Sequence, residues 1–225
     1  MKSYVALVLL LLSCNQKTEK KAHPYFEGVV EFKMEVAGEN GDTAMLKEIF
    51  GTAAKAFIKG KDVCRIYYND KGIIVSRELQ KTDSLKRYMW RADSDTVYVN
   101  DLSKSVSFKA VSIKNTAGKV ILGKTCKGVE MYSEYYASYD SEPEYNTAVY
   151  YFDSTQKLSP GIYEGVKYGS VEELFSRYPY LTLGYITTFF GGKYRLSMTA
   201  TKIIPTPMDD TYFQVPKNKT LIASF

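Results

Sequence analysis

This chain offers few of the residue combinations that enzymes use for catalysis. The only histidine, His23, lies in a polar stretch near the N-terminus. Nucleophilic catalysis needs a nucleophile, a base and an orienting group close together, and no serine lies in a Gly-x-Ser-x-Gly sequence. Catalytic zinc sites usually take at least one histidine ligand, which excludes histidine-based zinc catalysis. The sequence therefore predicts a protein that is not an enzyme and that holds no metal or other cofactor.

Three groups of acidic residues are close enough in sequence to act as acid and base or to bind calcium. Aspartate is also common in turns, where its side chain bonds the backbone. We therefore favour a structural explanation for each group and keep carboxylate catalysis as a distant alternative. The groups are Asp93 with Asp95, Asp140 with Glu142 and Glu144, and Asp209 with Asp210.

Covalent chemistry of another kind is indicated at Cys14, where an apolar run near the N-terminus ends. The run, residues 5–12, follows Lys2 and is too short to span a bilayer as a mature helix. The sequence Leu11-Leu12-Ser13-Cys14 resembles the lipobox of bacterial lipoproteins, in which the signal peptide is removed and the cysteine is acylated. The resemblance implies a membrane anchor on Cys14. An ordinary signal peptide with a chance cysteine and an N-terminal membrane helix are the alternatives.

The position of Cys14 divides the chain into segments. Residues 1–13 are the expected signal peptide, and residues 14–24 form a lipidated tether without apolar periodicity. Residues 25–217 are expected to form one β domain, followed by a C-terminal tail, residues 218–225. Asn15 is not the aspartate that resembles an inner-membrane retention signal, so we expect an outer-membrane lipoprotein on the periplasmic side.

Charge and composition limit the kinds of partner and the fold class that we expect. The formal net charge of +5 is spread along the chain, whereas nucleic-acid binding needs a clustered basic surface. We therefore expect no nucleic-acid partner. Tyrosine and phenylalanine are common, at 20 and 11 residues, which favours β-strands.

Apolar alternation and turn residues predict many short antiparallel strands. In the first of them, Val30, Phe32, Met34 and Val36 point to one side and the charged residues between them to the other. Residues 43–50 fit either a strand or a short helix, and we prefer a strand. The expected strands are 26–36, 43–50, 54–59, 63–69, 73–79, 86–91, 96–100, 106–114, 120–126, 129–136, 147–152, 181–190 and 193–201, with a short closing strand in 211–216.

One helix is predicted over residues 171–178. Ser170 and Glu173 are spaced as a capping box, and Pro179 ends the helix. Ten or more strands with one short helix indicate a mainly β protein, with a large antiparallel sheet that is curled on itself or packed as two layers.

Four segments in order resemble a family of secreted domains of unknown function from Bacteroidetes-type bacteria, whose fold is similar to the lipoprotein carriers LolA and LolB. The segments are 26–34, 58–63, 121–127 and 199–203 followed by 209–216. The resemblance implies a strongly curved antiparallel sheet, an open half-barrel, with an apolar concave side partly plugged by helix. In the carriers this cavity takes the acyl chains of lipoproteins. The chain departs from the carriers in having one clear helix and insertions such as residues 137–145.

We therefore expect a lipid-anchored envelope protein that binds an acyl chain, another apolar ligand or a lipoprotein in a concave cavity. The alternative is a structural or interaction module of the outer membrane with a fully packed core, which docks a protein partner through loops 140–144 and 153–169. The candidate ligand-binding residues are Phe32, Met34, Trp90, Tyr151, Leu174, Phe175, Leu196 and Met198.

Two cysteines, Cys64 and Cys126, remain after Cys14. Disulfides can persist in the cell envelope, so the two residues could pair. Cys64 shares a strand face with Ile66 and Tyr68, whereas Cys126 shares a face with Glu130. This parity favours two separate thiols over a disulfide.

Overall fold

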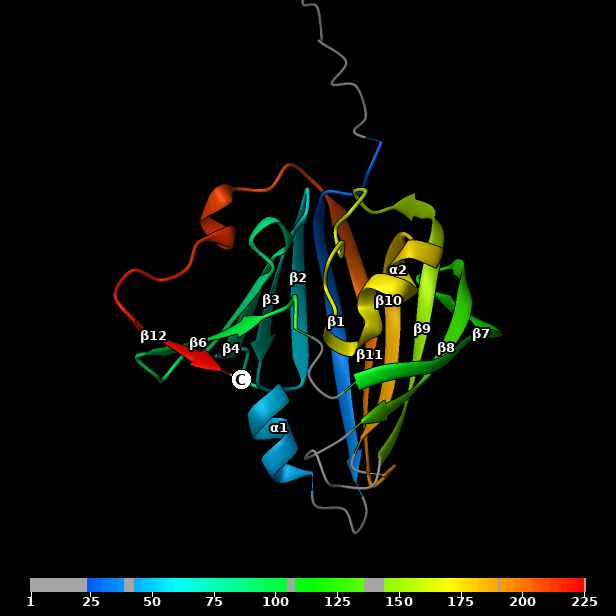
Figure 1. Cartoon of the computed structure of the whole chain (residues 1–225), viewed down its shortest axis with the longest axis horizontal. Coiled ribbons are helices and arrows are strands. Elements are labelled where there is room, and N and C mark those ends of the chain that lie inside the picture. The colour runs from blue at the N-terminus through cyan, green and yellow to red at the C-terminus, as the bar shows by residue number, and fades with distance from the viewer. Residues whose placement is uncertain (1–23, 39–42, 105–107, 136–143, 190, 225) are drawn as a thin grey trace, which may run out of the picture.

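A computed structural model describes residues 24–38, 43–104, 108–135, 144–189 and 191–224. These residues form one twelve-stranded sheet and two short α-helices, α1 (Ala44–Phe50) and α2 (Val171–Arg177). The sheet is strongly curved and does not close on itself (Figure 1). The prediction of a mainly β protein with an open half-barrel is confirmed.

The sheet consists of two meanders joined at the middle. Strands β1 to β6 pair in sequence order, as do β7 to β11, and the antiparallel pair β1–β11 joins the two sets. The last strand, β12, pairs with β6 in parallel and forms one edge. The strands are β1 (Gly28–Gly38), β2 (Ala53–Lys59), β3 (Asp62–Tyr68), β4 (Ile74–Lys81), β5 (Lys86–Arg91), β6 (Thr96–Asp101), β7 (Phe108–Ile121), β8 (Lys124–Tyr135), β9 (Glu144–Lys157), β10 (Tyr180–Phe189), β11 (Tyr194–Pro205) and β12 (Thr220–Ser224).

Strand β1 shows why the sheet has two buried faces. Phe32 and Met34 are buried and the lysine between them is exposed, as the alternation predicts. Val29 and Val30 are both buried although neighbouring side chains on a strand point to opposite faces. Opposite this region, the register shifts by one residue at Thr201 of β11, which is a β-bulge. The first half of the sheet is therefore covered on both sides.

The inner face, which we define as the face toward α2, is covered by α2 and by the covering segment, residues 158–170 (Figure 1). Val171, Leu174, Phe175 and Tyr178 repeat at helical spacing and pack against this face. The covering segment is tied to the sheet through the carbonyl of Ile162, which accepts hydrogen bonds from Thr82 Oγ1 at 2.6 Å and Gln80 Nε2 at 3.2 Å.

The outer face of β1 to β6 is covered by the C-terminal segment, residues 206–219, which runs from β11 to β12 around the side of the sheet (Figure 1). Met208 and Phe213 are buried there, in a cluster with Val29, Leu79 and Trp90. The ring of Tyr212 stacks on Phe57 at a centroid distance of 4.3 Å. This cluster is separate from the inner-face core.

Three expectations about secondary structure are wrong. Residues 43–50 form α1 rather than a strand, because β1 pairs directly with β2 and leaves no free edge for an additional strand there. The expected closing strand in 211–216 is a short 3-10 turn, Asp210–Phe213, and the last strand lies further on, within residues 218–225. Residues 106–114 and 120–126 are expected as separate strands, whereas β7 is continuous over Phe108–Ile121.

The capping box at the start of α2 is also not formed. Ser170 has a left-handed backbone conformation, with φ of 55°, and its side chain makes no capping bond. Its Oγ instead accepts a hydrogen bond from the backbone N–H of Ala110 on β7 at 2.9 Å. Glu173 forms an ion pair within the helix, with its Oε1 2.6 Å from Nη2 of Arg177. The serine therefore attaches the helix to the sheet.

The expected lipidation site Cys14, His23 and the acidic residues Asp140 and Glu142 lie outside the described residues. Within the described part of the chain, no helix is long and apolar enough to cross a membrane.

Candidate functional site: a cavity on the inner face

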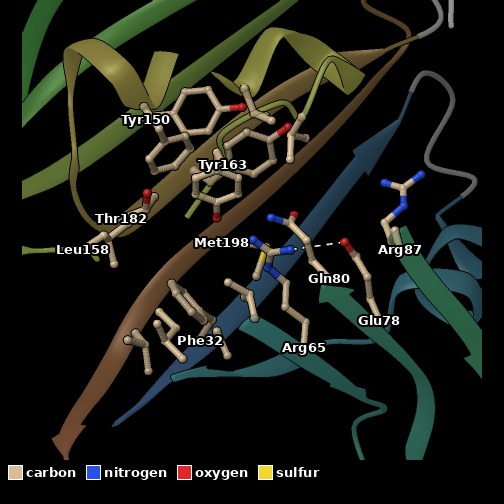
Figure 2. A pocket seen from close by; sticks show the side chains of 18 of the residues that line it. Phe32, Arg65, Glu78, Gln80, Arg87, Tyr150, Leu158, Tyr163, Thr182 and Met198 are labelled. Carbon is tan, nitrogen blue, oxygen red and sulfur yellow. Dashed lines mark hydrogen bonds and ion pairs between the residues drawn. The ribbon is translucent and has the colours of Figure 1, made fainter. Parts of the chain in front are cut away.

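A cavity of about 300 Å³ lies between the inner face of the sheet and its cover of α2 and the covering segment. Its walls come from β1 to β5, from β9 to β11, from the covering segment and from α2 (Figure 2). This volume is at the lower end of the range found for small-molecule sites. The cavity is partly open rather than sealed inside the protein.

The apolar wall is built mainly by the strands at the middle of the sheet. Phe32 from β1, Leu196 and Met198 from β11, and Phe175 of α2 all line the cavity. The ring of Phe175 stacks on Tyr163 at 4.1 Å and meets Tyr150 edge-on at 6.4 Å. The aromatic contacts fix the position of α2 against the covering segment.

The polar part of the lining comes mainly from β3 and β4. Arg65 Nη1 donates a hydrogen bond to Glu78 Oε1 at 3.2 Å, and Tyr67 OH donates to Glu78 Oε2 at 3.3 Å. Arg65 and Glu78 stand directly opposite each other in the β3–β4 pair. Their side chains are 29% and 18% exposed, and both line the cavity. The pair is therefore an ion pair in the cavity wall with both carboxylate oxygens bonded.

Burial sets the protonation states of the titratable groups in this wall. Burial lowers the pKa of the Arg65 guanidinium, but Glu78 and Tyr163 more than offset this, so its pKa is raised. Burial also raises the pKa of Tyr67, of Tyr163 and, most strongly, of Tyr150. The tyrosines therefore stay neutral around pH 7 and act as hydrogen-bonding groups rather than as bases.

Arg87 of β5 stands at the edge of the cavity and has an unmet hydrogen-bonding requirement. Its Cζ lies 4.2 Å from the centroid of the Tyr168 ring, a cation–π contact. Its Nε is buried and finds no partner among the described residues, and the same is true of Oδ1 of Asn100. Asn100 lies opposite Arg87 in the β5–β6 pair. A buried polar atom left without a partner costs about 1–3 kcal/mol.

Four of the eight predicted ligand-binding residues line the cavity, namely Phe32, Phe175, Leu196 and Met198. Met34 and Leu174 are buried in the inner-face core without reaching the cavity. Their side chains belong to the core beside the cavity, and a ligand-binding role for the eight residues stays a prediction.

Trp90 and Tyr151 lie elsewhere. Trp90 belongs to the outer-face cluster with Leu79, because on β5 it has the parity opposite to Arg87. Tyr151 does not line the cavity, whereas its neighbour Tyr150 does. The Tyr151 ring leaves no room for a side chain at Gly184, where a Cβ would come within 2.9 Å of it.

The two cysteines are free and buried. Cys64 lies in the outer-face cluster, as its predicted neighbours Ile66 and Tyr68 do, and Cys126 lies in the inner-face core. Burial raises the pKa of Cys64 to about 11 and also raises that of Cys126. Neither thiol is therefore a reactive thiolate around pH 7.

Three of the paired carboxylates, Asp93, Asp209 and Asp210, have structural partners. Asp93 accepts two hydrogen bonds from Arg91, at 3.1 and 3.3 Å, which lower the pKa of its carboxyl. Asp209 accepts from the N–H of Thr211 at 2.8 Å and starts the 3-10 turn, and Asp210 pairs with Lys59. Within the described ranges, no group of three or more His, Cys, Asp or Glu residues could hold a metal ion.

The charged residues of the cavity are the part that sequence reasoning missed. On β3, the residues Val63, Arg65 and Tyr67 share the face opposite to Cys64 and Ile66, and that face lines the cavity. The pairing of β3 with β4 could have revealed these residues, because its register places Arg65 directly opposite Glu78. The cover on that face comes from a segment about a hundred residues later, which strand alternation does not reveal.

No protein-family model matches the chain, and no curated protein sequence matches it significantly. Among the solved structures that match is an uncharacterized conserved protein from Thermus thermophilus, with a TM-score of 0.46, 5% identity, and coverage of 88% of this chain and 91% of that chain. Another is LprF from Mycobacterium bovis, with a TM-score of 0.35, 7% identity, and coverage of 86% and 90%. Neither similarity assigns a function, and membership of the Bacteroidetes-type family stays a prediction.

Proposed function

We propose that this protein is a non-enzymatic binding protein that holds an acyl chain or another apolar ligand in the inner-face cavity. The observation that carries this proposal is the cavity itself. It adjoins the inner-face core, and side chains such as Phe32, Leu196 and Met198 give it an apolar lining. Burial of apolar ligand surface in such a site is favourable by about 25 cal/mol per Å².

The chemistry of the lining supports binding rather than catalysis. Its carboxylate, Glu78, has both oxygens engaged by Arg65 and Tyr67. The tyrosines are held neutral by burial. The lining holds no pair of a nucleophile and a base of the kind that covalent catalysis needs.

We further propose that a lipid on Cys14 anchors the domain to the periplasmic side of the outer membrane. This part of the proposal rests on the lipobox-like sequence and on Asn15. One acyl chain gives only marginal membrane binding, whereas several hold a protein firmly. A tether of residues 14–24 then places the cavity within reach of membrane lipid or of lipoproteins in transit.

The test is native mass spectrometry of the full chain carrying Cys14→Ser, purified without detergent, followed by extraction of any bound molecule. We expect a co-purifying lipid or acyl compound. Ala56→Phe should remove it, because Ala56 lines the cavity and the added ring fills it. The matched control is Ala37→Phe, at an exposed position of β1. A folded protein that carries no ligand and binds no added amphiphile would overturn the proposal.

The alternative, a module with a fully packed core that docks a protein partner, has less support. A fully packed core leaves no room for a cavity of about 300 Å³ on the inner face. The acidic loop proposed for docking lies mostly outside the described residues.

A further inference from the structure

We propose that the ligand is an amphiphile with an anionic head and that Arg87 binds this head. The inference rests on the proposed function and specifies the class of ligand. It concerns the charge of the cavity wall rather than its apolar part.

The charges of the lining do not balance. The lining contains two arginines, Arg65 and Arg87, and one carboxylate, Glu78. Glu78 is bonded by Arg65 and Tyr67 through its two oxygens, so the charge of Arg65 is matched. The charge of Arg87 is left over, and the wall carries a net charge of +1.

The surroundings of Arg87 hold its side chain in place but supply neither a counter-charge nor an acceptor for its Nε among the described residues. The guanidinium packs over the Tyr168 ring at 4.2 Å, which fixes its plane. Its Nε has no acceptor among the described residues, and the Oδ1 of Asn100 on the adjacent strand also lacks a partner. The side chain as a whole is partly exposed and lines the cavity. Because a partly buried charge without a counter-charge is unfavourable, an anionic ligand group beside the guanidinium relieves an existing deficit.

The cavity separates this charge from its apolar wall. The charged residues come from β3, β4 and β5, whereas Phe32, Leu196 and Met198 come from β1 and β11. Figure 2 shows Arg87 on the opposite side of the view from Phe32 and Leu158. A ligand with its head at Arg87 therefore extends its chain toward β1 and β11. A guanidinium matches both carboxylate and phosphate oxygens, so the shared chemistry is an anionic head on an apolar chain.

The experiment compares amphiphiles of one chain length on the full chain carrying Cys14→Ser. The probes are dodecanoate, dodecyl phosphate, dodecanol and dodecyltrimethylammonium, with binding measured by titration calorimetry. We expect at least one of the two anions to bind about tenfold or more tighter than dodecanol, the fold-change that a charge-assisted hydrogen bond supplies. Preference for dodecanoate indicates a fatty acid, and preference for dodecyl phosphate a phosphate-headed lipid.

Two variants locate the effect. Arg87→Gln should lower the affinity for the two anions to that for dodecanol measured on the same variant, whereas Arg87→Lys should retain most of the anion preference. The control is Arg91→Gln, on the same strand but exposed and paired with Asp93. If Arg87→Gln does not fold, the comparison of probes on the parent chain still decides whether the ligand has an anionic head, and Arg87→Lys tests the role of Arg87.

The outcomes separate this inference from the proposed function. If dodecanol binds as tightly as both anions, or if the cation binds best, the head-group assignment is overturned and the apolar cavity stands. An anion preference that survives Arg87→Gln also overturns the role of Arg87. If none of the four probes binds, the proposed function fails together with the inference.

Discussion

The two faces of strands β3 to β5 differ although the same three strands build both. On the outer face, Leu79 and Trp90 pack against the C-terminal segment in an apolar cluster. On the inner face, the residues in alternate positions include Arg65, Glu78 and Arg87, and they border a cavity. The comparison shows that one face of this half of the sheet contributes to stability through close packing. The other face borders a cavity instead of being closely packed throughout.

The largest expected effect is on the outer face. Leu79→Ala should lower the free energy of unfolding by about 3 kcal/mol, because Leu79 is fully buried in a packed cluster. Leu196→Ala, in the cavity wall, should cost about 2 kcal/mol or less, since one side of its side chain already lacks neighbours. Urea denaturation measures both. An equal or larger loss for Leu196→Ala would contradict the division between the two faces.

A smaller effect is expected at the ion pair of the inner face. Glu78→Gln should lower the free energy of unfolding by about 1–3 kcal/mol, because Arg65 loses its charged acceptor in a partly buried wall. The double variant Arg65→Met with Glu78→Leu should recover part of this loss, since apolar replacements need no partner, while the Tyr67 hydroxyl loses its acceptor. Urea denaturation of the two variants measures the difference. A double variant no more stable than Glu78→Gln would argue against the conclusion that Arg65 and Glu78 act as a pair.

The smallest effect concerns the attachment of the inner cover. Ser170→Ala should cost about 1 kcal/mol, because the N–H of Ala110 loses its acceptor. Glu173→Gln should change stability by less than about 0.5 kcal/mol, since its bond to Arg177 is exposed. Thermal unfolding of both variants checks this order. A reversed order would restore the capping box that the sequence suggests.

Much of the sheet follows from sequence because alternation and turns are local properties. The inward positions of β1 and the bounds of β5 were predicted as observed. Residues 43–50 were not, because their conformation depends on which strand edges are already paired. Local patterns therefore give the strands but not the choice among pairing partners.

The candidate site was predicted less completely, because residues were chosen by type without asking which face of the strand each of them occupies. Trp90 was chosen as a large aromatic, although it has the opposite parity to Arg87 and points away from the cavity. Arg65 and Glu78 were missed because charged residues on a strand usually indicate solvent. Here they indicate a wall whose cover, including Tyr163, comes from much later in the chain.

The C-terminal segment has a consequence for the order of folding. Met208 and Phe213 cover strands that belong to the first half of the chain, so during synthesis these strands emerge long before their cover. Until residues 206–219 arrive, the apolar outer face of β2 to β5 is open to water and to other chains. Contacts of such long sequence separation form slowly. The first half of the sheet is therefore the part of this protein that most needs protection from aggregation while the chain is incomplete.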